Sequence, residues 1–488
     1  MIGLTNSIPK GYYALSQQET QMDNTHDISV RSSAENGLFI PALLPKFHNT
    51  GCSITKTADN RDVWIFEGSF ELDETERKCP ICGSRMRINN SFDVELRHVP
   101  VGRAFTRIRF IKHQVKCSHC KWAPTQKVPF QAAGHRITQE LLVYVCDLLA
   151  YGYTLKELAD STGLNRNTVK AIDTKRLEDN YVLVLEDKKL KKPEHQARYL
   201  AIDEFQLHSG HRYATHIIDL ETGHVLWISH GKKKQVVYDF IEHVGMDWMS
   251  GVEVVACDMN SDFQEAFEEK CDWIQIVYDY FHIMKNFNDK VINEIRRDEQ
   301  KSLKQQGKKV EADKLKKTKF LLTAKRTTLQ SNDRKAQENK ELNEENTLFP
   351  KKRYVPKGGQ EEKYDELIQA KPIFGVCNRV KVLIQEGYQS QSEPIMAEKV
   401  TEAINICNTS QNRHLIWFGK LLTNHFEGII AHATYQLSSG KIEGINNKIK
   451  TLRRKAYGFP NDDYFFLKII DISRKAYIRN PTSHRLCG

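Results

Sequence analysis

Residues 198–205 read Arg198-Tyr-Leu-Ala-Ile-Asp203-Glu-Phe205, an apolar run that leads into acidic residues. A short apolar run of this kind is typical of a buried β-strand. A strand that ends here holds Asp203 at the edge of a sheet. A second run, Val252-Glu-Val-Val-Ala-Cys-Asp258, delivers another aspartate in the same way. The sequence therefore predicts two carboxylates, Asp203 and Asp258, at the ends of two strands.

The elements around these two runs predict how the strands are arranged. The expected elements are strands at 199–203, 213–219 and 225–229, a helix at 234–244, a strand at 252–257, a helix at 262–271 and a strand at 274–278. This order is that of a ribonuclease-H-like fold. In such a fold the first and fourth strands lie side by side, so we expect Asp203 and Asp258 to be neighbours in space.

A third carboxylate, Glu443, lies far downstream in the stretch Lys-Ile-Glu-Gly-Ile-Asn-Asn-Lys-Ile-Lys, which has the pattern of a helix. Asn447, Lys450 and Arg454 follow it at steps of four, three and four residues, so all four share one helical face. Such a face suits a carboxylate that binds a metal ion, followed by an amide and two cationic side chains that bind successive phosphates of a nucleic acid. We therefore expect Asn447, Lys450 and Arg454 to contact DNA.

Three such carboxylates have the composition of a two-metal site. Two divalent cations about 4 Å apart assist both the attacking and the leaving oxygen in phosphodiester cleavage. Mg²⁺ prefers oxygen ligands and keeps several waters, so two or three carboxylates suffice. We expect Asp203 to bridge two Mg²⁺ (or Mn²⁺) ions, Asp258 to bind one and Glu443 the other. The alternative is that each carboxylate is an ordinary strand-end or helix-surface charge.

Asp279 and His282, in Tyr-Asp-Tyr-Phe-His, follow the last predicted strand. They are candidates for residues that contact the metal ligands without binding the metal themselves, or that contact DNA. The alternative is a turn-forming aspartate beside a histidine whose hydrogen bonds are satisfied in the core.

Upstream, residues 54–130 alternate in the β manner and contain Cys79-Pro-Ile-Cys82 and Cys117-Ser-His-Cys120. Two C-x2-C pairs supply four thiolates for tetrahedral zinc, and four protein ligands leave no open position, so this Zn²⁺ would be structural. The spacer of residues 83–116 has room for an extra hairpin. The alternative is two unrelated pairs of core cysteines.

The pattern becomes helical after residue 137, with helices expected at 138–150, 155–161 and 165–177. The turn Thr162-Gly163-Leu164 between the last two indicates a helix-turn-helix motif. The alternative is an ordinary helical hairpin. The third helix exposes side chains that are able to reach base edges and phosphates. They are Arg166, Asn167, Lys170 and Lys175.

The predicted fold class is an α/β multidomain protein: a β-rich zinc ribbon, a helix-turn-helix and a ribonuclease-H-like mixed sheet with a helical insertion. A chain of 488 residues is long enough for about two to four domains. The expected boundaries are a polar leader (1–53), the zinc ribbon (54–130), the helix-turn-helix (135–182), the two parts of the catalytic core (196–285 and 426–480) and a Lys/Glu-rich helical insertion (286–425).

The composition indicates what kind of partner the protein binds and in which cellular compartment it is expected. The net charge of +10 favours a polyanionic partner. The sequence lacks an apolar run of about 18 residues and a secretory signal, so we expect a cytoplasmic, nucleoid-associated protein without a membrane partner. Eleven cysteines in a reducing compartment argue against a disulfide framework.

The combined motifs resemble one family over residues 54–477. The two cysteine pairs, the helix-turn-helix, Ala-Ile-Asp203-Glu-Phe, Cys-Asp258-Met-Asn, Asp279-Tyr-Phe-His282 and Glu443-Gly-Ile-Asn-Asn-Lys-Ile-Lys450 are similar to the ISL-three family of bacterial insertion-sequence transposases. The resemblance implies cut-and-join transposition at terminal inverted repeats by a DDE catalytic domain.

The same resemblance implies that Asp203, Asp258 and Glu443 are the catalytic triad and that the four cysteines bind zinc. It also implies double-stranded DNA, both element ends and target, as the partner of a homodimer or higher oligomer. Lys450, seven residues after Glu443, matches a lysine that many DDE transposases use, whereas Ser439 stands where their arginine would fall. Two other classes remain open: a DNA-binding regulator derived from such an enzyme, and a metal-dependent nuclease or resolvase without strand transfer.

Overall fold

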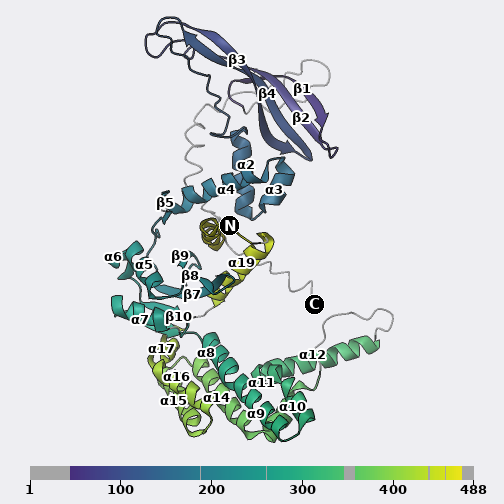
Figure 1. Ribbon diagram of the computed structural model, residues 1–488, viewed down its shortest axis with the longest axis vertical. Coiled ribbons are helices and arrows are strands. Elements are labelled where there is room, and N and C mark those ends of the chain that lie inside the picture. Colours follow the sequence, from purple (N-terminus) through teal and green to yellow (C-terminus); the bar gives the residue numbers. More distant parts are fainter. Residues whose placement is uncertain are drawn as a thin grey trace, which may run out of the picture. The chain divides into compact units, whose positions relative to one another are not determined.

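The computed structural model describes residues 44–186, 188–259, 261–345, 358–437, 440–456 and 458–474 (Figure 1). Within this part, helices and mixed sheets make a mixed α/β protein, as predicted. The chain divides into two compact units. One combines the chain up to Lys191 with Leu452–Ile472, and the other combines Lys192–Thr451 with the residues from Ser473 on. Most of the predicted leader lies outside the described residues.

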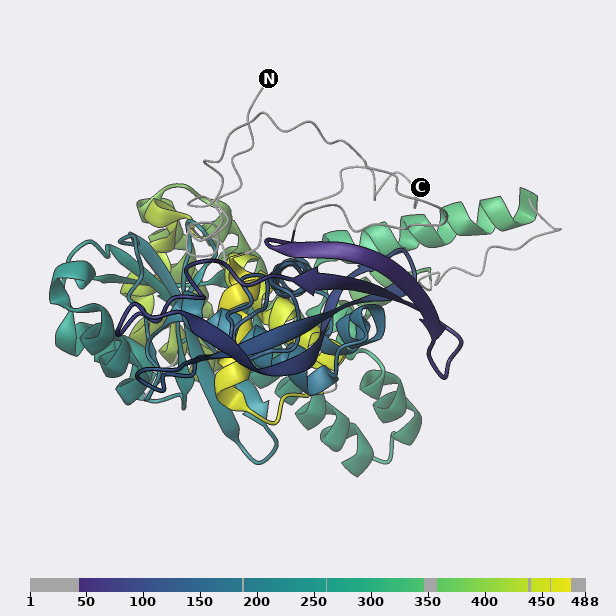
Figure 2. The same cartoon turned by 90° about the horizontal axis from the view of Figure 1, so that it is seen from above.

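The first unit begins with a four-stranded sheet whose long strands are visibly twisted (Figure 2). Its strands are β1 (Phe47–Lys56), β2 (Asp62–Phe70), β3 (Met86–Val101) and β4 (Ala104–Cys117), in the order β1-β2-β4-β3. The β2–β4 pair is parallel and the other two pairs are antiparallel. Aromatic rings, among them Phe70, Phe110 and Phe130, pack edge to face in its core. The β3–β4 hairpin is the extra hairpin expected between the two cysteine pairs.

Three helices follow: α2 (Gln139–Tyr151), α3 (Leu155–Thr162) and α4 (Arg166–Tyr181). Each helix begins within one residue of its predicted start. The side chain of a residue just before each helix caps its first turn, and such residues can be recognised in the sequence. They are Thr138, Thr154 and Asn165. The α3–α4 turn contains Gly163 at φ 70°, a conformation that glycine adopts without strain.

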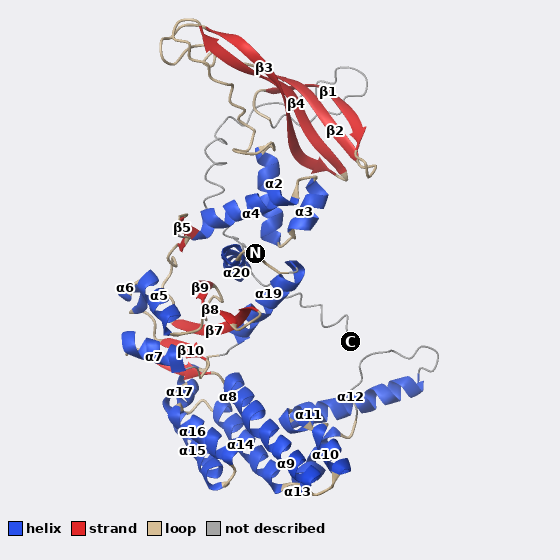
Figure 3. Cartoon of the chain, in the orientation of Figure 1, coloured by secondary structure: helices blue, strands red, loops and turns tan. Residues whose placement is uncertain are grey.

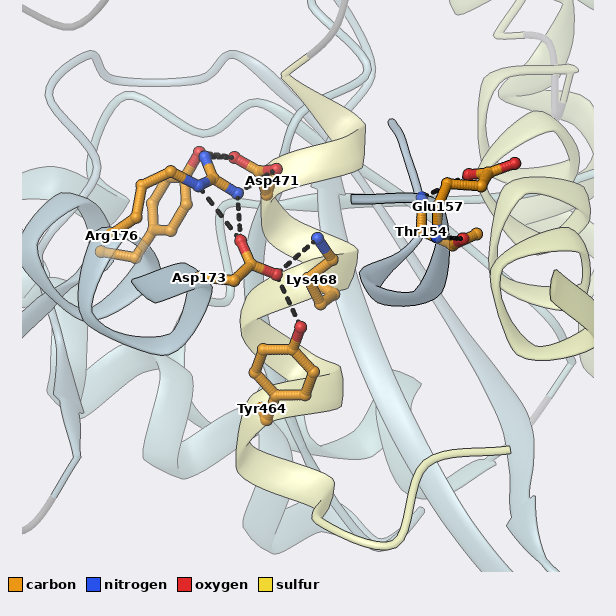
Figure 4. Close-up of polar contacts among 8 residues, drawn as sticks. Thr154, Glu157, Asp173, Arg176, Tyr464, Lys468 and Asp471 are labelled. Atoms are coloured by element: carbon orange, nitrogen blue, oxygen red, sulfur yellow. Dashed lines mark hydrogen bonds and ion pairs between the residues drawn. The ribbon is translucent and has the colours of Figure 1, made fainter. Parts of the chain in front are cut away.

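The first unit is completed by two later elements. A short hairpin joins β5 (Val182–Val184) to β6 (Lys189–Leu190), and α20 (Asp462–Ser473) packs against α4. Buried polar contacts link α20 to α4 (Figure 4). The sequence prediction assigned residues 426–480 to the catalytic core, whereas this helix groups with the N-terminal elements.

The second unit contains a five-stranded mixed sheet in the order β11-β10-β7-β8-β9. Strands β7 to β10 are labelled in Figure 3. Strands β10 and β11 run parallel to β7, whereas β8 and β9 are antiparallel. The predicted adjacency of the first and fourth strands, β7 and β10, is confirmed by their pairing. The strands are β7 (Tyr199–His208), β8 (Arg212–Asp219), β9 (Val225–His230), β10 (Val254–Cys257) and β11 (Gln275–Tyr278).

Helices α5 (Lys234–Val244), α6 (Met246–Met249) and α7 (Ser261–Lys270) lie between the strands in sequence. A largely helical region follows, as predicted, and shares one hydrophobic cluster with the sheet because Phe287 and Phe418 belong to the same core as Leu200. Its elements are α8 (Tyr280–Asn286), the π-helical η1 (Phe287–Ile292), α9 (Asn293–Gln305), α10 (Lys309–Lys316), α11 (Lys319–Thr323), α12 (Arg326–Glu345), α13 (Gln360–Ala370), α14 (Pro372–Gln389), α15 (Glu393–Thr409), α16 (Arg413–Asn424), α17 (Phe426–Ile430) and α18 (His432–Tyr435).

Two expectations for the helical region concern its loops and its end. The loops expected around Pro350 lie mostly outside the described residues. The predicted Glu443 helix is present as α19 (Gly440–Ala456). None of the helices within the described ranges is both long enough and apolar enough to cross a membrane.

Candidate functional site

Asp203 lies within β7 rather than at its end, which corrects the sequence prediction. The strand continues to His208 because β8 pairs along its whole length. On the other side, however, β10 pairs only with Tyr199 to Ala201. Asp203 therefore lies just beyond the last paired residue of that edge, and Asp258 directly follows β10.

One small pocket collects four of the predicted residues. Asp203, Asp258, Asp279 and His282 line it together with Ile442 of α19. Asp279 also caps α8, because its Oδ2 accepts a hydrogen bond from the Phe281 amide at 2.9 Å. The helix-capping role and a place in the pocket are thus compatible for this residue.

Asp258 and His282 form a close pair, with Oδ1 of the aspartate 3.3 Å from Nδ1 of the histidine. Burial alone would raise the pKa of Asp258, but His282 and the Met259 amide hold it below its ordinary value. Burial would likewise lower the pKa of His282, but Asp258 and the nearby Asp203 raise it. The pair therefore keeps the Asp258 carboxylate ionised, as a metal ligand requires.

Asp203 accepts hydrogen bonds at both carboxylate oxygens. Oδ1 accepts from the Glu204 amide at 2.8 Å, and Oδ2 accepts from Nδ2 of Asn446 on α19 at 2.6 Å. Sequence reasoning missed Asn446. The available signal was its spacing: three residues after Glu443, it lies close to the same helical face.

Glu443 is exposed in the first turn of α19 and does not line the pocket. Among the histidine, cysteine and acidic side chains of the described residues, four cysteines form the one group of three or more that is gathered closely enough to hold a metal ion. Asp203, Asp258 and Glu443 are not gathered in this way.

Two oxygens on residues that adjoin or contact Asp203 lack a partner within the described part of the chain. Oε2 of Glu204 and Oδ1 of Asn446 are buried and find no hydrogen-bond partner among the described residues. Buried polar atoms are normally paired. Burial also raises the pKa of Glu204, and Asp203 and Asp258 add to this effect while Lys232 opposes it. The three aspartates that line the pocket supply oxygen donors and negative charge, which suit a hard divalent ion.

The four predicted zinc ligands meet at the end of the β3–β4 hairpin, where Met86 pairs with Cys117. Their sulfurs all lie within 4.8 Å of one another, with Cys79 3.3 Å from Cys120 and Cys82 3.5 Å from Cys117. This confirms that the two pairs come together and excludes the alternative of unrelated core cysteines.

The protonation of the thiols also fits a cation at this cluster. A hydrogen bond from Ser84 and its neighbouring thiols lower the pKa of Cys82 to about 6. The Trp122 amide would lower the pKa of Cys120, but Cys79 and burial raise it to about 12. Crowded thiols cannot all ionise without a compensating charge, and a cation such as Zn²⁺ would supply it.

The predicted DNA-contacting residues differ in their surroundings. Lys170 has its Nζ 5.7 Å from the centre of the Tyr464 ring, and Lys175 forms an exposed ion pair of 2.6 Å with Asp179. The others are exposed at the start of α4 or along α19. They are Arg166, Asn167, Asn447, Lys450 and Arg454.

The fold and the pocket define a class: an α/β enzyme with acidic residues on adjacent strands, suited to divalent metal ions. Comparison with known families is more specific, because residues 200–469, more than half of the chain, match the model of the ISL-three DDE family, described as "Transposase". The chain therefore belongs to the ISL-three family of DDE transposases, as the motifs predicted.

A curated relative supports this assignment. The transposase for insertion sequence element IS1001 of Bordetella parapertussis is 26% identical over 403 residues, which cover 80% of this chain and 87% of the relative. DDE transposases act on DNA and use divalent metal ions, so family membership establishes the general class of reaction.

Proposed function

We propose that this transposase binds the terminal inverted repeats of its own insertion sequence and performs Mg²⁺-dependent strand cleavage and strand transfer. Its five-stranded sheet would be the ribonuclease-H-like core, with Asp203, Asp258 and Glu443 as the triad. The observation that carries the proposal is that Asp203 and Asp258 line one pocket on adjacent parallel strands.

Groups in contact with Asp203 and Asp258 prepare these carboxylates for the reaction. His282 keeps Asp258 ionised, and the Glu204 amide and Asn446 hold both oxygens of Asp203. When bound, two Mg²⁺ ions supply an activated oxygen nucleophile and stabilise the leaving oxygen. Glu443 completes the set from α19, which already contacts Asp203 through Asn446, one turn further along the helix.

DNA binding is assigned to two groups of residues. In the first unit, the cysteine cluster would be a zinc ribbon and α3–α4 a helix-turn-helix, with Arg166 and Asn167 exposed at the start of α4. Helix starts reach into the major groove in such motifs. In the second group, Asn447, Lys450 and Arg454 extend from Glu443 along α19 and would hold phosphates near the metals.

The test compares binding, cleavage and joining for Glu443→Gln. This variant should bind end DNA as the wild type does but lose cleavage, because a neutral amide lacks the negative charge with which the carboxylate holds Mg²⁺. Glu398→Gln is the matched control, since Glu398 is an exposed helical glutamate of α15. Retained cleavage in Glu443→Gln would remove Glu443 from the triad.

A strand-transfer assay on pre-cut ends with Mg²⁺ separates transposition from hydrolysis. Joined products from the wild type support the proposal. Nicked DNA without joined product identifies the protein as a nuclease or resolvase, and end binding without either product identifies a regulator.

A further inference from the structure

Asn446 links the two parts of the candidate active site that are farthest apart in sequence. Its Nδ2 donates a 2.6 Å hydrogen bond to Oδ2 of Asp203, 243 residues away. Ile442, Ile445 and Ile449 are buried on the same helix and fix its position. The contact is therefore made by a helix that packing holds in place.

The other end of the Asn446 amide is unusual. Its Oδ1 is buried and has no hydrogen-bond partner among the described residues. An asparagine oxygen left in this way is destabilising unless something else binds it. Neutral amide oxygens are ordinary ligands of hard cations, so a cation or its bound water would satisfy this atom.

We propose that Asn446 is a positioning residue of the metal site: its amide nitrogen orients Asp203, and its amide oxygen is an acceptor for the cation or for a water bound to it. This inference rests on the proposed function, in which Asp203 is a metal ligand. Glu204 holds the other oxygen of Asp203 through its amide, so the carboxylate is fixed from two directions. Each oxygen keeps a lone pair for metal.

The proposal predicts different effects on metal binding for two substitutions of Asn446. Asn446→Ala removes both the donor and the oxygen. Loss of a hydrogen bond that orients a metal ligand typically weakens metal binding about 10- to 100-fold. Asn446→Asp keeps an oxygen in place but brings a second carboxylate beside Asp203, which is unfavourable until a cation binds.

The experiment measures Mn²⁺ binding to the full-length, zinc-loaded chain by calorimetry and by thermal unfolding. Asn446→Ala should raise the Kd for Mn²⁺ by about tenfold or more. Asn446→Asp should lower Tm without Mn²⁺ and show a larger Mn²⁺-induced rise in Tm than the wild type, because a ligand that binds the folded state stabilises it. A Kd and a Tm response equal to those of the wild type in both variants overturn the proposal.

Two further variants locate the cause of any failure. Thr451→Ala, further along the same helix and exposed, should leave the Mn²⁺ affinity unchanged. Asp203→Asn should abolish Mn²⁺ binding. If Asp203→Asn loses binding while both Asn446 variants behave as the wild type, only the inference about Asn446 is wrong. If Asp203→Asn retains binding, the proposed metal site and the role of Asn446 are both wrong.

Discussion

At the scale of single residues, a buried set of charges surrounds Asp173 of α4. Its carboxylate is fully buried and accepts from Arg176 at 2.9 Å, Lys468 at 2.8 Å and the Tyr464 hydroxyl at 2.6 Å. Arg176 also binds Asp471 at 3.0 Å (Figure 4). Two carboxylates thus face two cations, and their charges balance.

Removing one of these cations should destabilise the protein strongly. Lys468→Met leaves Asp173 and Asp471 with Arg176 alone, and an uncompensated buried charge typically costs about 3 to 5 kcal/mol. We expect a loss of this order in the free energy of unfolding, measured with urea. Lys175→Met, which removes an exposed ion pair, should change it by less than about 1 kcal/mol. Equal effects of the two substitutions would contradict the structural role of the buried set.

Residue types and local spacing were sufficient to predict some of these positions. Cys79, Cys82 and the two strand aspartates stand out because their chemistry is unusual for their local pattern. The contacts of Asn446 and Asp173 could not be predicted, because their partners lie 243 and 295 residues away in sequence and belong to other elements. An apolar run that stops at Asp203 predicts a strand end there, whereas pairing with β8 extends the strand to His208.

At the scale of elements, the helical region contains a buried lysine that holds a helix end. Nζ of Lys381 on α14 donates to the carbonyls of Thr323, at 3.3 Å, and Ala324 at the C-terminal end of α11. These carbonyls lack partners within the helix, so a cation suits them. Burial, with the nearby charge of Lys325, nevertheless lowers the pKa of Lys381 to about 8.

This lowered pKa predicts a pH dependence of stability. The unfolded chain keeps the ordinary lysine pKa near 10.4, so between about pH 8 and pH 10 it binds more protons than the folded protein. Stability relative to Lys381→Met should therefore rise with pH across this window, by up to about 3 kcal/mol. Urea unfolding of both proteins at pH 7 to 10 measures the difference, and parallel curves would contradict the prediction.

At the scale of the whole molecule, the division into units is less sequential than the pattern of motifs suggests. The sequence predicts consecutive domains because each pattern occupies one stretch of chain. The division instead falls within α19, between Thr451 and Leu452, and α20 joins the first unit. Tyr464 and Leu467 pack with Leu177 there. No local pattern in α20 indicates a partner so far upstream, because its apolar residues fit either unit.

A fragment that ends with the predicted helix-turn-helix should therefore be incomplete. In residues 44–191 alone, Asp173 and Arg176 lose their ion pairs with Lys468 and Asp471. Leu177 also loses the apolar residues of α20 that pack against it. Fusing residues 458–474 through a flexible Gly/Ser linker should restore both contacts. Because a buried pair is worth about 3 kcal/mol and 1 kcal/mol shifts Tm by about 2 to 4 °C, the fused fragment should melt about 10 °C higher.

The control carries Lys468→Met in the fused segment and should recover only part of that gain, since its apolar contacts remain. Equal melting of the short and fused fragments would show that α4 folds without α20, and the boundary predicted from sequence would then be sufficient.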